Sequence, residues 1–142
     1  MIGFILTGHG EFAPGLAGAL ELVAGRQEAF KVVPFDVDKA SDYPELIHGE
    51  IAAMREQTDG VVVFCDLLGG TPFNQAMMAS QTTPDVEIVV GANLPMLIET
   101  LFARSSDESA TISSLVETAV NAGKNGVDTR KFEVCADDED DE

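Results

Sequence analysis

From Val61 to Pro72 the chain reads VVVFCDLLGGTP, its most apolar run followed by an acidic residue and a glycine-rich turn. A short run that is apolar throughout is typical of a central parallel strand buried on both faces. Pro72 suits the start of a helix, where its missing N–H costs nothing, and we expect Thr71 to be the N-cap. The stretch therefore predicts a strand, a turn and a helix, the building unit of a parallel α/β sheet.

Strand-like and helical patterns alternate along the rest of the chain. Further strands are predicted at residues 2–7, 29–35 and 86–90, with a less apolar strand at an edge of the sheet at 130–135. Helices are predicted at about 14–25, 46–58, 72–80, 93–104 and 112–123. We therefore expect one α/β domain over residues 1–136, with an open, mostly parallel sheet of order 2-1-3-4 and helices on both faces.

Length and charge narrow the class of protein. The chain has 142 residues, 45% of them hydrophobic, which suits one globular domain. Lys and Arg number 8 against 25 Asp and Glu, a net charge of −17, and residues 137–142 form an acidic tail. Such a field repels phosphate backbones and anionic lipids, which argues against nucleic-acid binding and against adsorption to membranes.

The chain also lacks signals for export or membrane insertion. No run approaches the roughly 20 apolar residues of a spanning helix, and the first residues do not resemble a signal peptide. The two cysteines, Cys65 and Cys135, show no disulfide pattern. We therefore expect a cytoplasmic protein.

Two chemically suggestive side chains follow neighbouring strands of the predicted sheet. His9 comes after the first strand, and Asp66 ends the third. In an open parallel sheet, ligands bind beyond the carboxyl ends of the strands where the strand order reverses, here between these two strands. Asp66 would accept a hydrogen bond from Nδ1–H of His9, fix its tautomer and leave Nε2 free as a nucleophile.

The turn after this carboxylate has the features of a phosphoryl-binding loop. Gly69 and Gly70 let the backbone approach a ligand, and the N–H groups of the next helix point to the same crevice. Thr7 and Thr71 add hydroxyl groups. Neither loop contains Lys or Arg, so a phosphoryl group on His9 would be held by neutral donors, which suits a group that is picked up and passed on.

The same crevice is compatible with other classes of function. A non-catalytic module would bind a small anion or a flavin there. A metal-dependent hydrolase would need more ligands, but His48 lies in a helical pattern and Cys65 should point away from Asp66. The usual nucleotide-binding motifs are missing as well.

Three motifs, at residues 5–10, 63–74 and 91–101, closely resemble the enzyme IIA component of the mannose-type phosphoenolpyruvate-dependent sugar phosphotransferase system (PTS). The similarity covers residues 1–125 in order. The resemblance implies an α/β fold and a homodimer in which the last strand can cross to the partner's sheet. It also implies a phosphotransferase whose histidine after the first strand is transiently phosphorylated, with no metal and no cofactor required.

The resemblance also implies roles for residues and partners. His9 would take a phosphoryl group on Nε2 from the carrier protein HPr and hand it to the IIB component, which serves the membrane components IIC and IID. Asp66 would accept the bond from Nδ1, while Gly70, Thr71 and Thr7 would donate to the phosphoryl oxygens. No IIB domain follows in the chain, so we expect IIB to be a separate polypeptide.

Details of the motifs bear on the type of sugar system. The mannose-specific member has an aromatic residue where this chain has Leu67 and Leu68, so mannose is not implied. The run at residues 70–73 looks more like members that serve amino sugars. A related alternative is the phosphocarrier subunit of a dihydroxyacetone kinase, although the run at residues 70–74 argues against it.

Overall fold

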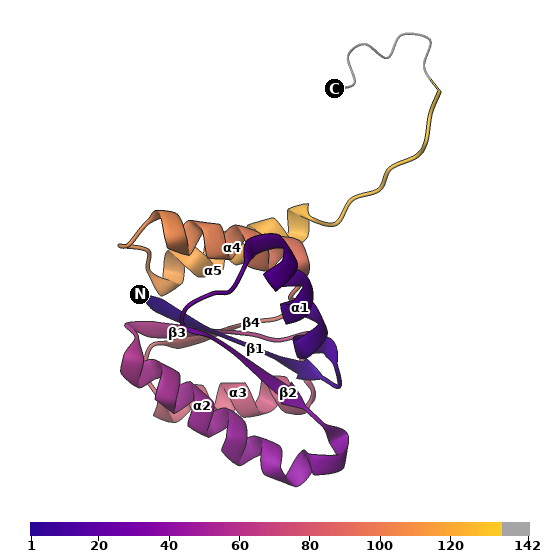
Figure 1. The fold of residues 1–142 in the computed structure, drawn as a ribbon. Helices are drawn as coiled ribbons and strands as arrows, with labels where there is room; N and C mark the ends of the chain where they lie inside the picture. Colours follow the sequence, from indigo (N-terminus) through magenta and orange to yellow (C-terminus); the bar gives the residue numbers. More distant parts are fainter. Residues whose placement is uncertain (135–142) are drawn as a thin grey trace.

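Four parallel strands form the sheet that organises the fold, and the computed structural model describes residues 1–134 (Figure 1). Their order, β2-β1-β3-β4, confirms the order predicted from the sequence. The strands are β1 (Ile2–His9), β2 (Phe30–Phe35), β3 (Gly60–Phe64) and β4 (Val86–Val89). The helices are α1 (Phe12–Ala24), α2 (Tyr43–Gln57), α3 (Gly70–Thr82), α4 (Leu94–Ser106) and α5 (Ile112–Asn125), and a 3-10 helix, η1 (Val37–Asp42), precedes α2.

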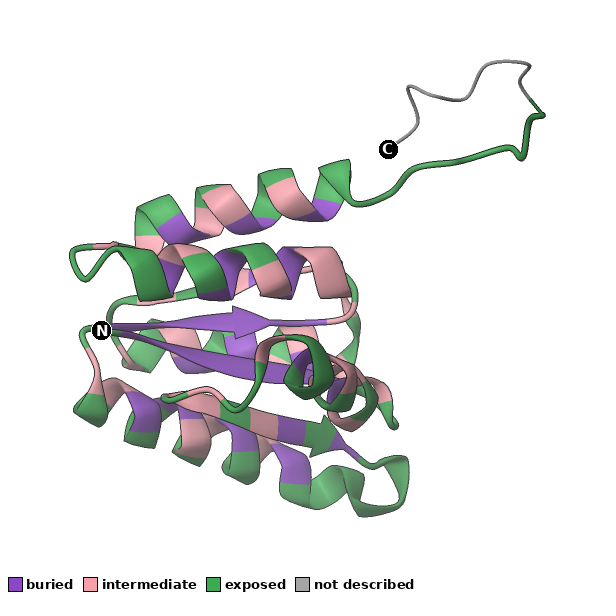
Figure 2. Cartoon of the chain, turned by 45° about the horizontal axis from the view of Figure 1, so that its top comes forward, coloured by how far each residue is buried: buried purple, intermediate pink, exposed green. Residues whose placement is uncertain are grey.

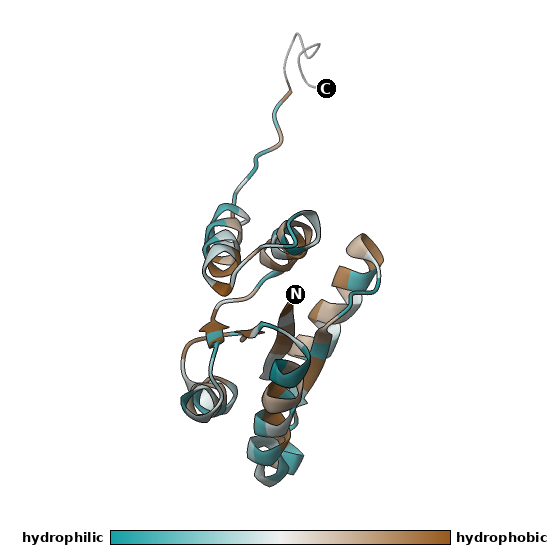
Figure 3. Cartoon of the chain, turned by 90° about the vertical axis from the view of Figure 1, so that its left-hand side faces the viewer, coloured by the Kyte–Doolittle hydropathy of each residue, from teal (hydrophilic) through white to brown (hydrophobic). Residues whose placement is uncertain are grey.

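Helices cover both faces of the sheet, as expected for βαβ units. In Figure 1, α1, α4 and α5 lie on one side of the strands, and α2 and α3 lie on the other. Side chains alternate along β1, so Phe4 and Leu6 pack into the core beneath the first group of helices, whereas Ile5 packs into the core beneath the second. Hydrophobic colour gathers on the strands and on the helix faces turned toward them (Figure 3).

The central strands are buried and the edge strands are not. All of β3 is buried, and so is β1 apart from His9, whereas β2 and β4 contain partly exposed residues (Figure 2). This matches the continuous apolar runs of the two central strands. A central strand that ends in a polar residue therefore delivers that residue to the carboxyl edge of the sheet.

Helix α3 begins earlier than the sequence suggested. The chain turns at Gly69 and Gly70, whose φ angles of 87° and 83° are positive, and Gly69 occupies the N-cap position. The prediction that Thr71 is the N-cap is therefore wrong, because the two glycines complete the turn before it. Pro72 is buried within the first turn of α3. Its lack of a backbone N–H costs nothing there, because the N–H groups of a first turn have no partner within the helix.

The predicted edge strand near the C-terminus does not form in the single chain. Residues 130–134 pair with neither edge of the sheet and run away from its body (Figure 1). Phe132 and Val134 are 90% and 87% exposed. Because the segment lies beside no strand, it makes no cross-strand hydrogen bonds that would offset the entropy cost of ordering it. Cys135 and the acidic tail at 137–142 lie outside the described residues.

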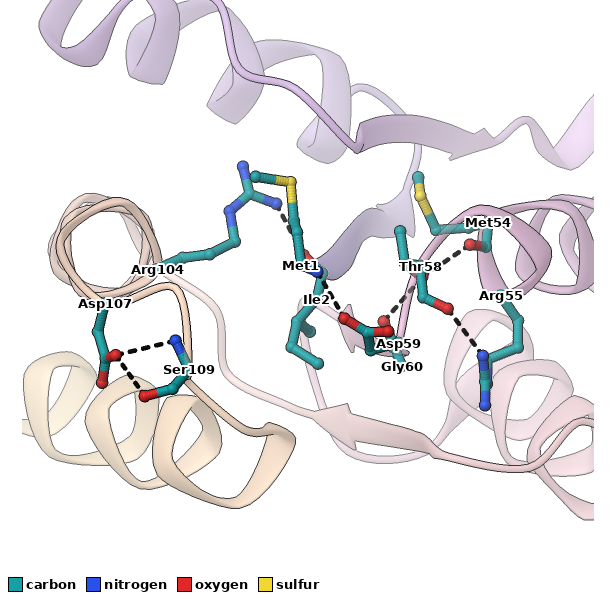
Figure 4. Close-up of polar contacts among 10 residues, drawn as sticks. All are labelled: Met1, Ile2, Met54, Arg55, Thr58, Asp59, Gly60, Arg104, Asp107 and Ser109. Atoms are coloured by element: carbon teal, nitrogen blue, oxygen red, sulfur yellow. Dashed lines mark hydrogen bonds and ion pairs between the residues drawn. The ribbon is translucent and has the colours of Figure 1, made fainter.

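A buried cation fastens the opposite, amino end of the sheet. Arg104 of α4 is 6% exposed, and its Nη1 donates to the backbone oxygen of Ile2 at 2.9 Å (Figure 4). Its Nη2 donates to the oxygen of Glu28 at 2.7 Å, and the guanidinium lies 4.4 Å from the centre of the Phe4 ring. These contacts tie α4 to β1 and to the segment that leads into β2.

No helix within residues 1–134 combines the length and apolar composition needed to cross a membrane.

Candidate functional site

The pairing of the two central strands brings the sequence-predicted residues His9 and Asp66 together. His9 is the last residue of β1, and Asp66 comes two residues after the end of β3. The two strands are parallel, with Leu6 opposite Phe64, so β1 and β3 end close together at the carboxyl edge of the sheet. The site thus lies where the strand order reverses, the usual position of ligands in open α/β sheets.

Three N–H groups surround the carboxylate of Asp66. Nδ1 of His9 lies 2.8 Å from Oδ2, and the backbone N–H of His9 donates to the same oxygen at 2.9 Å. The N–H of Leu67 donates to Oδ1 at 2.9 Å. Because an ionised carboxylate only accepts, its Nδ1 partner carries the proton, and Nε2 of a neutral His9 keeps its lone pair. The lone pair of Nε2 is thereby left available for bonding.

Burial and hydrogen bonding act in opposite directions on Asp66. Its side chain is 12% exposed, against 45% for His9. Burial by itself raises the pKa of Asp66, but the hydrogen bonds and the charge of His9, together with the N–H of Leu67, lower that pKa below its ordinary value. Asp66 is therefore a carboxylate at neutral pH.

Gly70 leaves the space beside Nε2 of His9 open. A Cβ atom at Gly70 would lie 3.0 Å from Cε1 and 3.1 Å from Nε2 of His9. At Gly8, a Cβ atom would lie 2.6 Å from the Phe12 ring and 3.0 Å from Cγ of Asp66. A side chain at Gly70 would thus crowd Nε2 of His9. Gly69, before it, has open space where a Cβ would stand.

The two threonines of the predicted phosphoryl site differ in position. Thr71, in the first turn of α3, is partly exposed beside Gly70. Thr7 is fully buried, and its hydroxyl lies 2.6 Å from that of Tyr43. Direct contact between Thr7 and a group on Nε2 would therefore require this pair to separate.

Sequence reasoning missed two aromatic residues near the histidine. Phe35, at the end of β2, lies opposite His9 in the strand register, and its ring meets the imidazole edge to face with centroids 5.8 Å apart. Tyr43 packs against Phe35 in the same manner at 5.0 Å. The signal was the end of the second predicted strand, which adjoins the first when the order is 2-1-3-4.

His48 and Cys65 lie apart from this chemistry. Nε2 of His48 on α2 lies 3.1 Å from Oε1 of Gln75 on α3. Cys65 is buried, and burial together with the charge of Asp66 raises the pKa of its thiol to about 12. Within residues 1–134, no cluster of three or more His, Cys, Asp or Glu side chains could hold a metal ion.

Comparisons with known proteins place the chain in a family. The model of the family described as PTS system fructose IIA component matches residues 3–120, and the chain belongs to this family. The resemblance to mannose-type PTS IIA components is thereby confirmed. Among relatives, the mannose-specific EIIAB component of Escherichia coli strain K12 is 34% identical over 92% of this chain and 40% of its own. The fructose-specific EIIA component of Bacillus subtilis is 26% identical over 96% and 88%.

Solved structures show the same fold. The EIIA component from Streptococcus agalactiae has a TM-score of 0.79 and 29% identity over 91% of this chain and 97% of its own. The mannose/sorbose-specific IIA subunit from Enterococcus faecalis has a TM-score of 0.70 and 26% identity over 94% and 98%. The chain thus spans nearly all of these structures but 40% of the length of its mannose-specific relatives.

Asp66→Asn tests the role of the carboxylate charge. We expect the variant to lose about 1 to 3 kcal/mol of unfolding free energy at pH 7, because three N–H donors lose a charged acceptor. The pKa of Asp66 is lower in the folded chain than in the unfolded chain. Its stabilisation is therefore present above the unfolded value, about 3.9, and is lost as pH falls through the folded value.

Urea unfolding at a series of pH values measures this difference between the wild-type chain and Asp66→Asn. It should be largest near pH 7 and shrink below about pH 4. Asp38→Asn, at an exposed position in η1, is the matched control and should change stability little at any pH. A loss for Asp66→Asn that stays constant into the acidic range would contradict the proposed charge effect.

Proposed function

We propose that the chain is a phosphocarrier of a sugar phosphotransferase system, in which His9 receives a phosphoryl group from HPr and passes it to IIB. The observation that supports this most directly is the 2.8 Å contact between Nδ1 and Asp66, which leaves the lone pair of Nε2 free on a half-exposed side chain. Family membership points to the same reaction class.

The transfer step needs no proton from outside the pair. The lone pair of Nε2 forms a bond to the phosphorus of phospho-HPr, while the electron pair of the old P–N bond stays on the HPr nitrogen. The proton on Nδ1 of His9 remains there, in its hydrogen bond to Asp66. The ring gains positive charge as the new bond forms, and the adjacent carboxylate stabilises that charge. In the second transfer a nucleophile of IIB forms a bond to the phosphorus, the P–Nε2 bond breaks, and its electron pair returns to the ring of His9.

The start of α3 is suited to hold the phosphoryl oxygens. Backbone N–H groups at Gly69, Gly70 and Thr71 begin a helix whose dipole favours negative charge. We assign direct contacts to this loop and not to Thr7, whose hydroxyl is paired with Tyr43. No metal or cofactor enters the step.

The surface around the site suits basic carrier proteins. Leu67 and Leu68 are 50% and 71% exposed beside the histidine. Exposed acidic residues follow the ends of β1 and β2, among them Glu11, Asp36 and Asp38. Apolar contacts surrounded by negative charge would attract and orient a positively charged HPr or IIB in the cytoplasm. The membrane components IIC and IID would be reached only through IIB, and the site makes no contact with the sugar.

Phosphorylation followed by intact mass tests this function. The purified chain, mixed with phosphoenolpyruvate, enzyme I and HPr, should gain one acid-labile phosphoryl group. His9→Ala should gain none, because the nucleophile is absent, whereas His48→Ala should be labelled like the wild-type chain. Full labelling of His9→Ala would overturn the assignment. A wild-type chain that gains no label, but melts at higher temperature with a small anion or a flavin, would support a binding module instead.

We also propose a homodimer that uses the C-terminal segment. Three large apolar side chains near the C-terminus are exposed: Val127 by 76%, Phe132 by 90% and Val134 by 87%. Within residues 1–134, the outer edge of β4 pairs with no strand. Addition of this segment from a second copy to that edge would satisfy both surfaces.

Light scattering measures this assembly. The full chain should be a dimer at micromolar concentration, and a chain that ends at residue 126 should be a monomer because the exchanged segment is gone. A monomeric full chain would contradict the proposal, as would a truncated chain that remains dimeric.

A further inference from the structure

A buried pair of hydroxyl groups lies under the site and is not used by the transfer step. The hydroxyls of Tyr43 and Thr7 are 2.6 Å apart, and the two residues are 2% and 0% exposed. Tyr43 is the first residue of α2, whereas Thr7 is in β1, two residues before His9 and on the same face of the strand. The pair therefore ties α2 to β1 about 7 Å along the strand from the histidine.

A second contact leads from Tyr43 to the imidazole through Phe35. The Phe35 ring, 7% exposed, meets Tyr43 at 5.0 Å and an interplanar angle of 76°. It also meets the ring of His9 at 5.8 Å and 89°. Edge-to-face aromatic pairs have a preferred orientation, so a displaced tyrosine ring would displace Phe35 and the imidazole beside it.

These contacts border the imidazole, which is otherwise 45% exposed. Asp66 accepts a hydrogen bond from Nδ1, and the ring of Phe35 packs against the imidazole. Gly70, which has no side chain, lies beside Nε2 and Cε1. Burial raises the pKa of Tyr43 above its usual range, so its hydroxyl stays neutral and remains able to donate. The bond to Asp66 and the packing against Phe35 together favour the orientation in which Nδ1 faces the carboxylate.

The hydrogen bond between these two hydroxyls fixes the relative position of α2 and β1 more than it stabilises the fold. Replacing both partners of a buried hydrogen bond by apolar groups of the same shape is often nearly neutral for folding. Phe and Val would fill the same space as Tyr43 and Thr7, but their contact could slide. The hydrogen bond instead sets the position of α2 relative to β1.

We propose that Tyr43 is a positioning residue for phosphoryl transfer: through Thr7 and Phe35 it holds the imidazole of His9 where Nδ1 meets Asp66 and Nε2 faces the incoming group. This inference rests on the proposed function of His9 as phosphoryl acceptor.

The double variant Thr7→Val with Tyr43→Phe tests the proposal, since it removes both hydroxyls and keeps the shapes. Its melting temperature should stay near that of the wild-type chain. Its rate of phosphoryl uptake from phospho-HPr should fall about 10-fold, because small displacements of a reacting group carry large kinetic costs. At alkaline pH, the ¹⁵N shifts of the His9 ring should move from the Nδ1–H form toward a mixture of tautomers.

Thr100→Val is the matched control. Thr100 is a fully buried threonine of α4 whose hydroxyl donates to the oxygen of Met96 at 2.6 Å, in the core on the other side of the sheet. It should leave both the uptake rate and the His9 shifts unchanged. If the double variant does not fold, Tyr43→Phe alone keeps the ring against Phe35 and is expected to show both changes in smaller degree.

Wild-type uptake together with wild-type ¹⁵N shifts in a folded variant would overturn the role of Tyr43. Equal slowing by Thr100→Val would do so too, because it would show a general effect of core changes. If the wild-type chain accepts no phosphoryl group, the proposed function fails. The ¹⁵N shifts of unphosphorylated His9 then still show whether Tyr43 positions the ring.

Discussion

The hydrogen bond between Nδ1 of His9 and Oδ2 of Asp66 is the interaction on which the proposed chemistry of this protein depends. It joins two residues 57 positions apart, and it forms because β1 and β3 are neighbours in the sheet. A carboxylate at this nitrogen selects one tautomer of the imidazole. That selection converts an ordinary exposed histidine into one whose Nε2 is available to form a bond.

The rest of the fold supports this contact from several directions. Buried central strands carry the two residues to the same edge, and the glycine turn before α3 keeps the space beside Nε2 free. Further N–H groups, from the backbones of His9 and Leu67, keep Asp66 ionised despite its burial. At the far end of the sheet, Arg104 fastens α4 to β1. The site is thus a local arrangement at the edge of a rigid scaffold.

Sequence reasoning succeeded where a local pattern and the topology were sufficient. Continuous apolar runs identified the central strands, and their predicted order placed His9 beside Asp66. It failed where a distant residue or an unusual backbone angle decided the outcome. The hydroxyl of Thr7 pairs with that of Tyr43, and the positive φ angles of Gly69 and Gly70 move the N-cap away from Thr71. Residues 130–134 alternate like a strand, but in the single chain they pair with neither edge of the sheet.

The position of the phosphoryl group on the imidazole tests the central claim most directly. NMR of the phosphorylated, ¹⁵N-labelled chain identifies the ring nitrogen that is bonded to phosphorus and the one that carries a proton. If Asp66 selects the tautomer, phosphorus is bonded to Nε2 of His9, and Nδ1 keeps its proton in the hydrogen bond to the carboxylate. Phosphorus bonded to Nδ1, or to a residue other than His9, would contradict the account.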